Sequence, residues 1–235
     1  MRINLNLLLT LCLIGNILSV VAQNTGSRSE GYKAFGTITR QLNSNNTLDL
    51  SKVKGSPYAN EAFLPGQIFF KEKNIKIDAN LRYNVFNDEF EVKEDLQSEN
   101  ISAMIKSTDL EVFLANKRYM LRPFTENGAE KEGYFIVISD GKGLGIYERK
   151  TKIFTEGKKA SDSFHIDFPP SFTDESELYH DENGIMVLYP INKKDLLILC
   201  SDHKEEVTNF IKKSKLNTKS NEDLIKIIQY YNSLN

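Results

Sequence analysis

The sequence predicts a mainly β protein of the α+β class: a curled or barrel-like antiparallel sheet of about ten short strands, followed by a C-terminal pair of helices. Three observations support this prediction. Apolar and polar residues alternate between Ile75 and Val85, as in a strand with one buried face. Turn residues separate further short apolar runs between residues 66 and 200. Residues 201–235 instead carry apolar side chains three and four positions apart, the spacing of an amphipathic helix.

The N-terminus has the layout of a secretory signal peptide. Arg2 gives a positive start, residues 7–14 form an apolar block, and small residues precede a cleavage site between Ala22 and Gln23. A retained membrane anchor is the alternative, but polar residues interrupt the segment, whereas a membrane span needs about 20 apolar residues in a row. We therefore expect residues 1–22 to be removed and the mature chain to be exported to the periplasm, the cell surface or the medium.

Composition limits the remaining classes of function. The chain has 30 Lys and Arg against 32 Asp and Glu, and no basic patch interleaves with aromatic residues, so a nucleic-acid partner has no electrostatic support. No second apolar run approaches spanning length, so we expect no membrane span in the mature chain. Cys12 leaves with the signal peptide and Cys200 remains alone, so stability must come from a hydrophobic core. The abundance of Lys, Asn and Ile over Arg indicates an AT-rich bacterial genome.

Residues 23–56 are polar and weakly patterned. They are expected to form a loosely structured N-terminal segment, with one short strand near Ala34–Thr39. An antiparallel β domain is expected from residue 57 to residue 200. Its first strand is the apolar run at residues 67–70, and its second is the alternating run that begins at Ile75.

A hairpin is predicted to follow, because the apolar positions change from odd to even numbers between Val85 and Phe90. A two-residue turn at Asn87-Asp88 would pair Val85 with Phe90 and keep the apolar residues of both strands on one face. Asn and Asp tolerate the positive φ that such turns require.

More strands are expected along the rest of this domain. Turn residues at Asn116-Lys117 and at residues 140–143 separate them, and Pro169-Pro170 interrupts the pattern. Many short strands joined by tight turns indicate an antiparallel sheet that curls or closes. The expected strands lie at residues 110–114, 118–122, 133–139, 144–149, 153–154, 177–180, 184–189 and 195–200.

Residues 201–235 are predicted to form a helical pair that packs on the sheet. Ser201-Asp202 can cap a helix over residues 203–213. Ser220 can cap a second helix, whose first turn is acidic and whose apolar residues recur at helical spacing from Leu224 to Tyr231. Both helices would bury one face and so cover an edge or an open end of the sheet.

Three segments together resemble a group of uncharacterised exported proteins of bacteroidete-type bacteria. They are GSPYANEAFLPGQIFF (55–70), LRYNVFNDEFEV (81–92) and EDLIKIIQYYNSL (222–234). In that group a Gly-Ser-Pro-Tyr start, an Arg-Tyr-Asn strand and a Tyr-Tyr-Asn helix recur around a β-rich middle. The resemblance covers residues 50–234 and implies a cell-envelope protein. It implies no activity, because the group has no assigned mechanism.

No nucleotide-binding site is predicted from the glycine-rich segment. Gly141, Gly143 and Gly145 resemble a phosphate-binding loop in their spacing. Such a loop, however, must be followed by the N-terminus of a helix. Residues 146–148 are instead predicted to be a strand. A hairpin turn is therefore the better interpretation, and we expect no cofactor.

No catalytic or metal-binding residues are predicted either. Cys200 and His203 are close in sequence, but the apolar residues before Cys200 indicate a buried thiol rather than a nucleophile. His165, His180 and His203 each have acidic neighbours. No pair of them shows the tight spacing typical of a zinc site, which needs about four convergent ligands.

One polar group on an ordered element is a candidate recognition surface, with Arg82 lying diagonally across from Glu91. The alternative is a solvated strand whose charges deter edge pairing. The loop that begins Gly-Ser-Pro-Tyr would join this surface if it folds nearby. The candidate residues are Arg82, Asn84, Asp88, Glu89, Glu91 and Tyr58.

Three hypotheses of function remain open. The first is a non-catalytic exported envelope or secreted protein with a binding or structural role, whose partner is an unknown envelope protein. The alternative is a carrier of a lipid or other apolar ligand inside a β cavity. The third is a hydrolase that uses scattered carboxylates such as Asp140 or Asp167, which nothing in their spacing favours.

Overall fold

Strands are the main regular structure of the described residues. The structure, a computed structural model, describes residues 35–42, 50–126, 128–159 and 167–235. The predicted signal peptide and its cleavage site at Ala22 and Gln23 lie outside these residues. Within the described residues, the strands are β1 (Thr39–Gln41), β2 (Leu64–Phe70), β3 (Ile75–Asn84), β4 (Glu89–Lys93), β5 (Ser102–Met104), β6 (Leu110–Leu114), β7 (Lys117–Glu126), β8 (Ala129–Ser139), β9 (Ile146–Thr155), β10 (Ser171–Glu182) and β11 (Ile185–Leu188).

The strands form one curled sheet, as the sequence predicts. Their order is β1-β5-β4-β3-β2-β6-β7-β11-β10-β9-β8, and β8 also pairs with β7. Every pairing of these strands is antiparallel except one parallel bridge between Met186 of β11 and Phe124 of β7. The half of the sheet from β7 to β11 therefore curls back on itself, but the whole is not a clear barrel.

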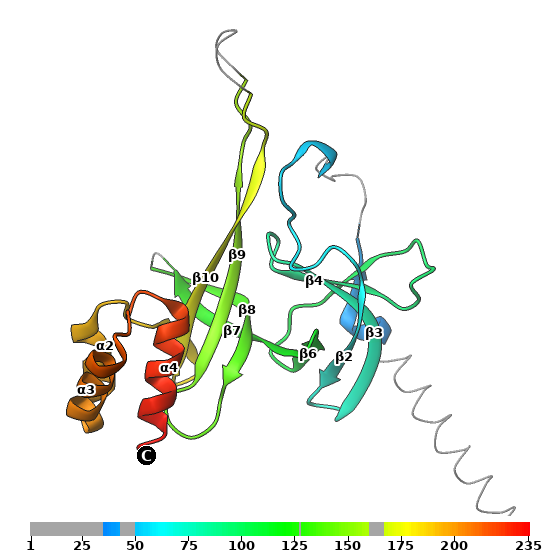
Figure 1. Cartoon of the computed structure of the whole chain (residues 1–235). Helices are drawn as coiled ribbons and strands as arrows, with labels where there is room; N and C mark the ends of the chain where they lie inside the picture. The colour runs from blue at the N-terminus through cyan, green and yellow to red at the C-terminus, as the bar shows by residue number, and fades with distance from the viewer. Residues whose placement is uncertain (1–34, 43–49, 127, 160–166) are drawn as a thin grey trace, which may run out of the picture.

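The helices lie at the C-terminal end of the chain. Figure 1 shows α2, α3 and α4 together beside β7 to β10 and away from β2 to β4. Short 3-10 helices occur before β2 and before α3. The helices from residue 50 onward are η2 (Leu50–Lys52), α2 (Lys193–Leu199), η3 (Ser201–His203), α3 (Lys204–Ser214) and α4 (Asn221–Asn232).

Three clusters of buried side chains hold these elements together. The largest lies on β2 to β8 and contains Phe90, which is fully buried. A second lies inside the curled half and contains Phe124 and Phe135. The third joins the helices to the sheet, because Ile146 packs with apolar residues of α2, α3 and α4. The predicted packing of the C-terminal helices on the sheet is therefore present.

The last helix is also fixed by hydrogen bonds. The Asn232 side chain accepts from the backbone N–H of Leu144 at 2.8 Å and donates to its carbonyl at 2.8 Å. Asn232 thus acts like one rung of a strand pairing, with both polar backbone groups of one residue satisfied. It joins the end of α4 to the turn between β8 and β9.

The predicted β3–β4 hairpin is present, but its turn is longer than expected. Asn84 pairs with Glu89, so the turn has the four residues 85–88 rather than the two at Asn87-Asp88. Two hydrogen bonds and one backbone angle favour the longer turn. The Asn84 side chain accepts from the N–H of Asn87 at 3.1 Å, and the N–H of Val85 donates to the carbonyl of Pro57. Asp88 has φ 51°. The shift is two residues, so both strands keep their predicted buried faces.

The prediction of a strand at residues 195–200 is wrong. This segment is the helix α2, which begins after Asn192, whose side chain accepts from the N–H of Asp195 at 2.9 Å. Leu196 and Cys200 lie four residues apart and are both fully buried, so they share one helix face. The helical part of the chain thus begins at Lys193, before the predicted boundary.

Three smaller differences concern local boundaries. Residues 35–38 form a helical turn and the strand follows at Thr39, so a strand near Ala34–Thr39 is predicted too early. The turn after β6 lies at Ala115-Asn116, both with positive φ, rather than at Asn116-Lys117. Ser201-Asp202 make no capping bond to α3 and form part of η3. The predicted cap at Ser220 is confirmed, with its Oγ accepting from Asp223 N.

Candidate functional site

The loop that begins Gly-Ser-Pro-Tyr folds over the end of the β3–β4 hairpin. Tyr58 forms an antiparallel bridge with Asn84, and the N–H of Ala59 donates to the carbonyl of Tyr83 at 2.9 Å. Gly55 has φ +82° and lies against the Phe172 carbonyl, a position that disfavours any side chain. The loop therefore lies on the candidate recognition residues.

Arg82 is held between two aromatic rings of this loop. The centre of its guanidinium lies 3.8 Å from the centroid of the Tyr58 ring and 4.4 Å from that of Phe63. Its Nη2 donates to the Tyr58 hydroxyl at 3.1 Å, and its Nη1 donates to the carbonyl of Glu61 at 3.0 Å. Stacking between rings and a forked set of donors is a use that suits arginine better than lysine.

The carboxylate of Glu91 neutralises this arginine. Arg82 and Glu91 lie directly opposite each other, not diagonally as predicted. Nε of Arg82 donates to Oε2 of Glu91 at 3.0 Å, and Nη2 donates to the same oxygen. The Asn84 side chain donates to Oε1 at 3.3 Å. Burial raises the pKa of the Tyr58 hydroxyl, and Glu91 adds to the rise.

Four of the six candidate residues therefore form one network under the loop. The side chain of Arg82 is 17% exposed and that of Glu91 is 8% exposed. Their polar atoms bond to Asn84 and Tyr58 rather than to solvent, so the network anchors the loop to the sheet.

The other two candidates lie apart from this network. Oδ1 of Asp88 accepts from the Tyr83 hydroxyl at 2.6 Å and from the N–H of Tyr134 at 3.2 Å. Nζ of Lys106 lies 3.4 Å from its Oδ2. Glu89 instead pairs with Arg40 of β1. Burial raises the pKa of the Tyr83 hydroxyl well above its ordinary value, and Asp88 adds to the rise. Asp88 thus links the β3–β4 turn to β8.

The sequence pattern does not predict the long hairpin that β9 and β10 form. Their ladder continues from Tyr147 opposite Tyr179 to Thr155 opposite Ser171, and an isolated bridge joins Lys158 to Phe168. Figure 1 shows this hairpin projecting well beyond the rest of the sheet. We call residues 149–158 and 168–178 the arm.

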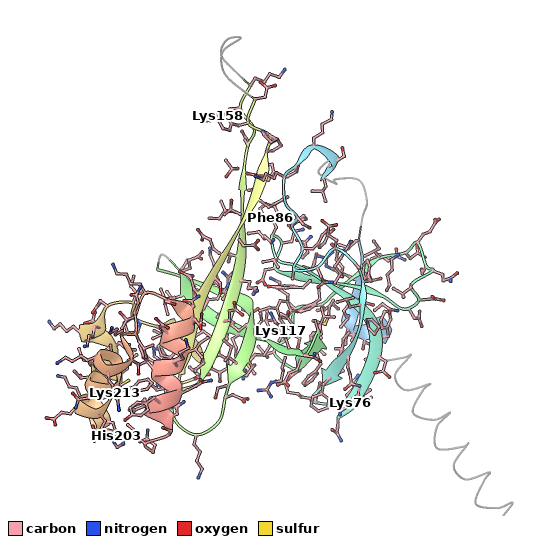
Figure 2. The ribbon with its side chains drawn as sticks, in the orientation of Figure 1. Lys76, Phe86, Lys117, Lys158, His203 and Lys213 are labelled. Carbon is pink, nitrogen blue, oxygen red and sulfur yellow. The ribbon has the colours of Figure 1, made fainter. Side chains whose placement is uncertain are left out.

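Aromatic rings anchor the arm midway along its length. The Phe86 ring lies 5.2 Å from that of Phe172 and 6.3 Å from that of Phe154. Figure 2 shows Phe86 at this position, below the part of the arm that carries Lys158. The rings tie the arm to the turn between β3 and β4, so the arm has a defined direction.

Two apolar side chains of the arm are open to solvent: Ile153 is 46% exposed and Phe168 is 70% exposed. A sequence signal for the arm exists in the alternation of Ile153 with polar neighbours. It is weak because the first half of β10 is the acidic run TDESE, residues 173–177, which has low strand propensity. The strand was therefore expected to begin at Glu177 rather than at Ser171.

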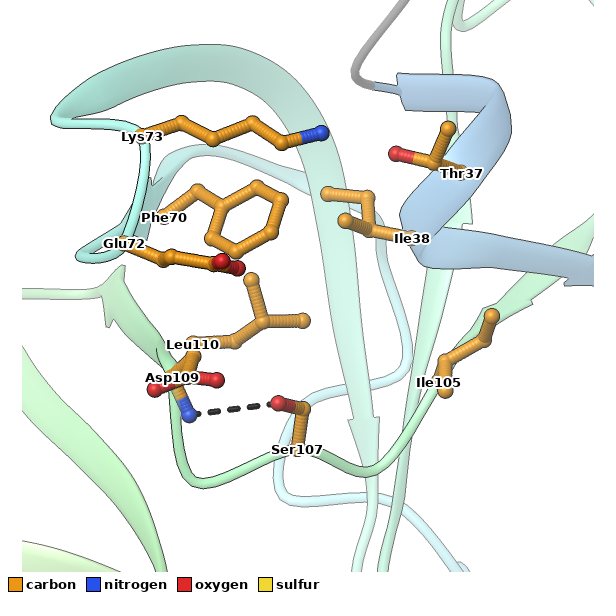
Figure 3. A pocket seen from close by; sticks show the side chains of 9 residues that line it. All are labelled: Thr37, Ile38, Phe70, Glu72, Lys73, Ile105, Ser107, Asp109 and Leu110. Carbon is orange, nitrogen blue, oxygen red and sulfur yellow. Dashed lines mark hydrogen bonds between the residues drawn. The ribbon is translucent and has the colours of Figure 1, made fainter.

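A hollow of about 490 Å³ lies beside β2 and β6, in the half of the sheet that does not carry the arm. Its floor is apolar and its rim is charged, with Nζ of Lys73 lying 4.9 Å from the centroid of the Phe70 ring. Figure 3 shows the Lys73 side chain reaching across the hollow toward Thr37. The lining residues are Thr37, Ile38, Phe70, Glu72, Lys73, Ile105, Ser107, Asp109 and Leu110.

The thiol is placed as the sequence predicts. Cys200 is fully buried in the cluster between the helices and the sheet, and burial raises its pKa to about 11. A thiol with a raised pKa forms little thiolate at neutral pH and is a poor nucleophile.

The histidines are dispersed. His180 is buried against the ring of Tyr189, and burial lowers its pKa. His203 lies 3.8 Å from Glu206 at the start of α3, and His165 lies outside the described residues. No group of three or more metal-ligating side chains occurs in the part of the chain that the structure describes.

The glycine-rich segment forms a turn, and the two carboxylates Asp140 and Asp167 lie in separate parts of the fold. Gly143 has φ +89° in the turn between β8 and β9, and a strand follows it rather than a helix. Asp140 forms an ion pair with Arg118, while Asp167 lies beside the distal bridge of the arm.

No family model matches this sequence, and neither a curated protein nor a solved structure is significantly similar to it. The helices within the described residues are all too short or too polar to cross a membrane.

Proposed function

We propose that this chain is a non-catalytic exported protein of the cell envelope or the extracellular medium, and that it binds another protein through the arm. The observation that carries the proposal is the projection of the arm beyond the sheet with Ile153 and Phe168 exposed. Ile153 and Phe168 lie on opposite faces of the arm, and each offers apolar surface that a partner protein could bury. The aromatic anchor midway along the arm supports this role, since a surface with a defined direction loses less entropy on binding.

The filled interior of the sheet also supports a binding role. Large aromatic side chains fill the core on the buried face of the sheet. Tyr83, Phe90 and Tyr134 are almost fully buried and contact one another. This arrangement leaves the outer surface as the place for recognition.

The alternative, a carrier of a lipid or other apolar ligand, has one observation in its favour. The hollow beside Phe70 has an apolar floor and a volume within the range of small-molecule sites. Native mass spectrometry of freshly purified protein would separate the two proposals. A bound lipid would favour the carrier, and its absence would favour the protein-binding role.

Crosslinking from the arm tests the protein-binding role directly. A photo-reactive amino acid at position 153 or 168 is expected to form adducts with one defined protein in cells that naturally produce the chain. The matched control is position 198 on α2, where Ile198 is 63% exposed and lies on the helices rather than on the arm. The difference between positions, rather than capture itself, is the evidence. Equal adducts at all three positions, or none at the arm, would contradict the proposal.

The export step has its own test. Sequencing the N-terminus of protein recovered outside the cytoplasm is expected to begin at Gln23, because Ala22 supplies the small side chain that signal peptidase requires. The substitution Ala22→Tyr is expected to leave the precursor uncleaved. A mature chain that still begins at Met1, with the unsubstituted sequence, would show that this segment is not a cleaved signal.

A further inference from the structure

One edge of β9 is without a partner strand along the arm. The ladder between β8 and β9 reaches only to Ile136 opposite Glu148, whereas the ladder between β9 and β10 continues to Thr155. From Arg149 to Thr155, therefore, β9 is paired on one edge only among the described residues. Such an edge presents N–H and C=O groups that another extended chain can use.

The opposite edge of the arm already pairs with one residue of a preceding loop, Lys54. The N–H of Lys54 donates to the carbonyl of Pro170 at 2.8 Å, and the N–H of Phe172 donates to the carbonyl of Lys54 at 2.9 Å. These bonds form a parallel bridge on the outer edge of β10. The backbone of the arm is thus suited to receiving a neighbour, and the edge of β9 lies on its other side.

The charges along β9 favour an acidic neighbour. Arg149, Lys150 and Lys152 follow one another along the edge. Lys152 is paired with Asp174 at 2.7 Å, and Lys150 lies 3.9 Å from Glu148. Arg149 forms no ion pair with any described residue: its guanidinium lies 4.4 Å from the centroid of the Phe124 ring, and its buried Nε has no acceptor.

The same charges oppose pairing of β9 with a second copy of itself. Two such edges would place lysine and arginine side chains close to one another, and like charges across a ladder are destabilising. Lysine on an exposed edge has this protective effect against identical strands. An acidic strand meets no such barrier.

We propose that the partner adds to the sheet as an extended strand along the edge of β9 from Arg149 to Thr155, and that this strand alternates acidic with apolar residues. Main-chain hydrogen bonds supply the pairing. The acidic residues lie beside Lys150 and Lys152, which share one face of β9, and an apolar residue packs on Ile153, on the other face. This inference rests on the proposed function of the arm and names the chemistry of its partner.

The test uses the chain from Gln23 to Asn235 and a fluorescent seven-residue peptide of alternating Glu and Val. We expect the peptide to bind, with binding weakened by salt and at least tenfold weaker when Lys replaces Glu or when alternate valines are N-methylated. Bound peptide is expected to slow the hydrogen exchange of those β9 amides that point away from β10. In the variant Lys150→Glu we expect weaker binding, and in the control Lys213→Glu on α3 we expect no change.

Several results would overturn strand addition while leaving the arm as a binding surface. They are peptide binding without slower exchange on β9, equal binding of the Glu and Lys peptides, and no binding at millimolar peptide. A rise in molecular mass with protein concentration, with protection of β9 in the absence of peptide, would identify a second copy as the occupant and equally overturn the proposal. The crosslinking contrast between position 153 and position 198 tests the arm separately from these results.

Discussion

Arg82→Met is expected to lower the free energy of unfolding by about 3–5 kcal/mol, the usual cost of removing one partner from a buried ion pair. The substitution leaves the carboxylate of Glu91, 8% exposed, without its cation. It also removes the guanidinium from between the Tyr58 and Phe63 rings, which weakens the attachment of the loop to the sheet. Urea unfolding of the purified chain measures the loss.

Two further variants make this prediction specific. Arg82→Met combined with Glu91→Leu is expected to recover most of the lost stability, because no unpaired charge remains. Arg118→Met is the control, since Arg118 is 30% exposed and pairs with Asp140, itself 46% exposed. The second partner of Arg118, Glu111 at 3.9 Å, would keep Lys71 at 4.0 Å. The loss for Arg118→Met is expected to stay below about 1 kcal/mol. Equal losses for Arg82→Met and Arg118→Met, or no recovery in the double variant, would show that the network does not stabilise the fold.

The faces of the β3–β4 hairpin could be predicted from sequence, whereas the length of its turn could not. Alternation fixes which side chains are buried, and a shift of two residues does not change it. One of the contacts that favour the longer turn comes from Pro57, whose carbonyl accepts from Val85 N. That contact comes from a loop far earlier in the chain, and no local pattern shows it.

The helix α2 is a different kind of error, because a local signal was present. Asn192 is followed three residues later by Asp195, and an Asn before an acidic third position is typical of a helix start. The apolar run after it suggested a strand, since short apolar runs do not distinguish the two structures. The capping residue Asn192 indicated the helix correctly, whereas the apolar run did not.

The candidate site could also be predicted only in part, because some of its contacts join segments far apart in the sequence. Proximity of Arg82 and Glu91 follows from the hairpin, and the structure brings them together. The two rings that enclose Arg82 come from residues 58 and 63, and Asp88 reaches the N–H of Tyr134, 46 residues later. Such contacts depend on the order of strands in the sheet, which period-two patterns do not contain. The polar strand was therefore predicted as an open surface and is in fact covered.

Phe90→Ala is expected to lower the free energy of unfolding by about 3–5 kcal/mol, the range for truncating a buried aromatic residue. Phe90 is fully buried, and its ring centroid lies 4.7 Å from that of Tyr83, 5.1 Å from that of Tyr119 and 4.9 Å from that of Tyr134. These partners come from β3, β7 and β8, so the cavity would weaken contacts between separate parts of the sheet. A shift of the urea midpoint measures the loss.

The matched control is Phe86→Ala, four residues earlier in the same hairpin. Phe86 is 47% exposed, so the same truncation removes about half as much buried surface and is expected to cost about 1 kcal/mol. If Phe90→Ala does not fold, Phe90→Leu gives a smaller loss of about 1–2 kcal/mol that can still be measured. Equal losses for Phe86→Ala and Phe90→Ala would mean that the rings around Phe90 do not pack as described, because the chemical change is identical and only the surroundings of the two rings differ.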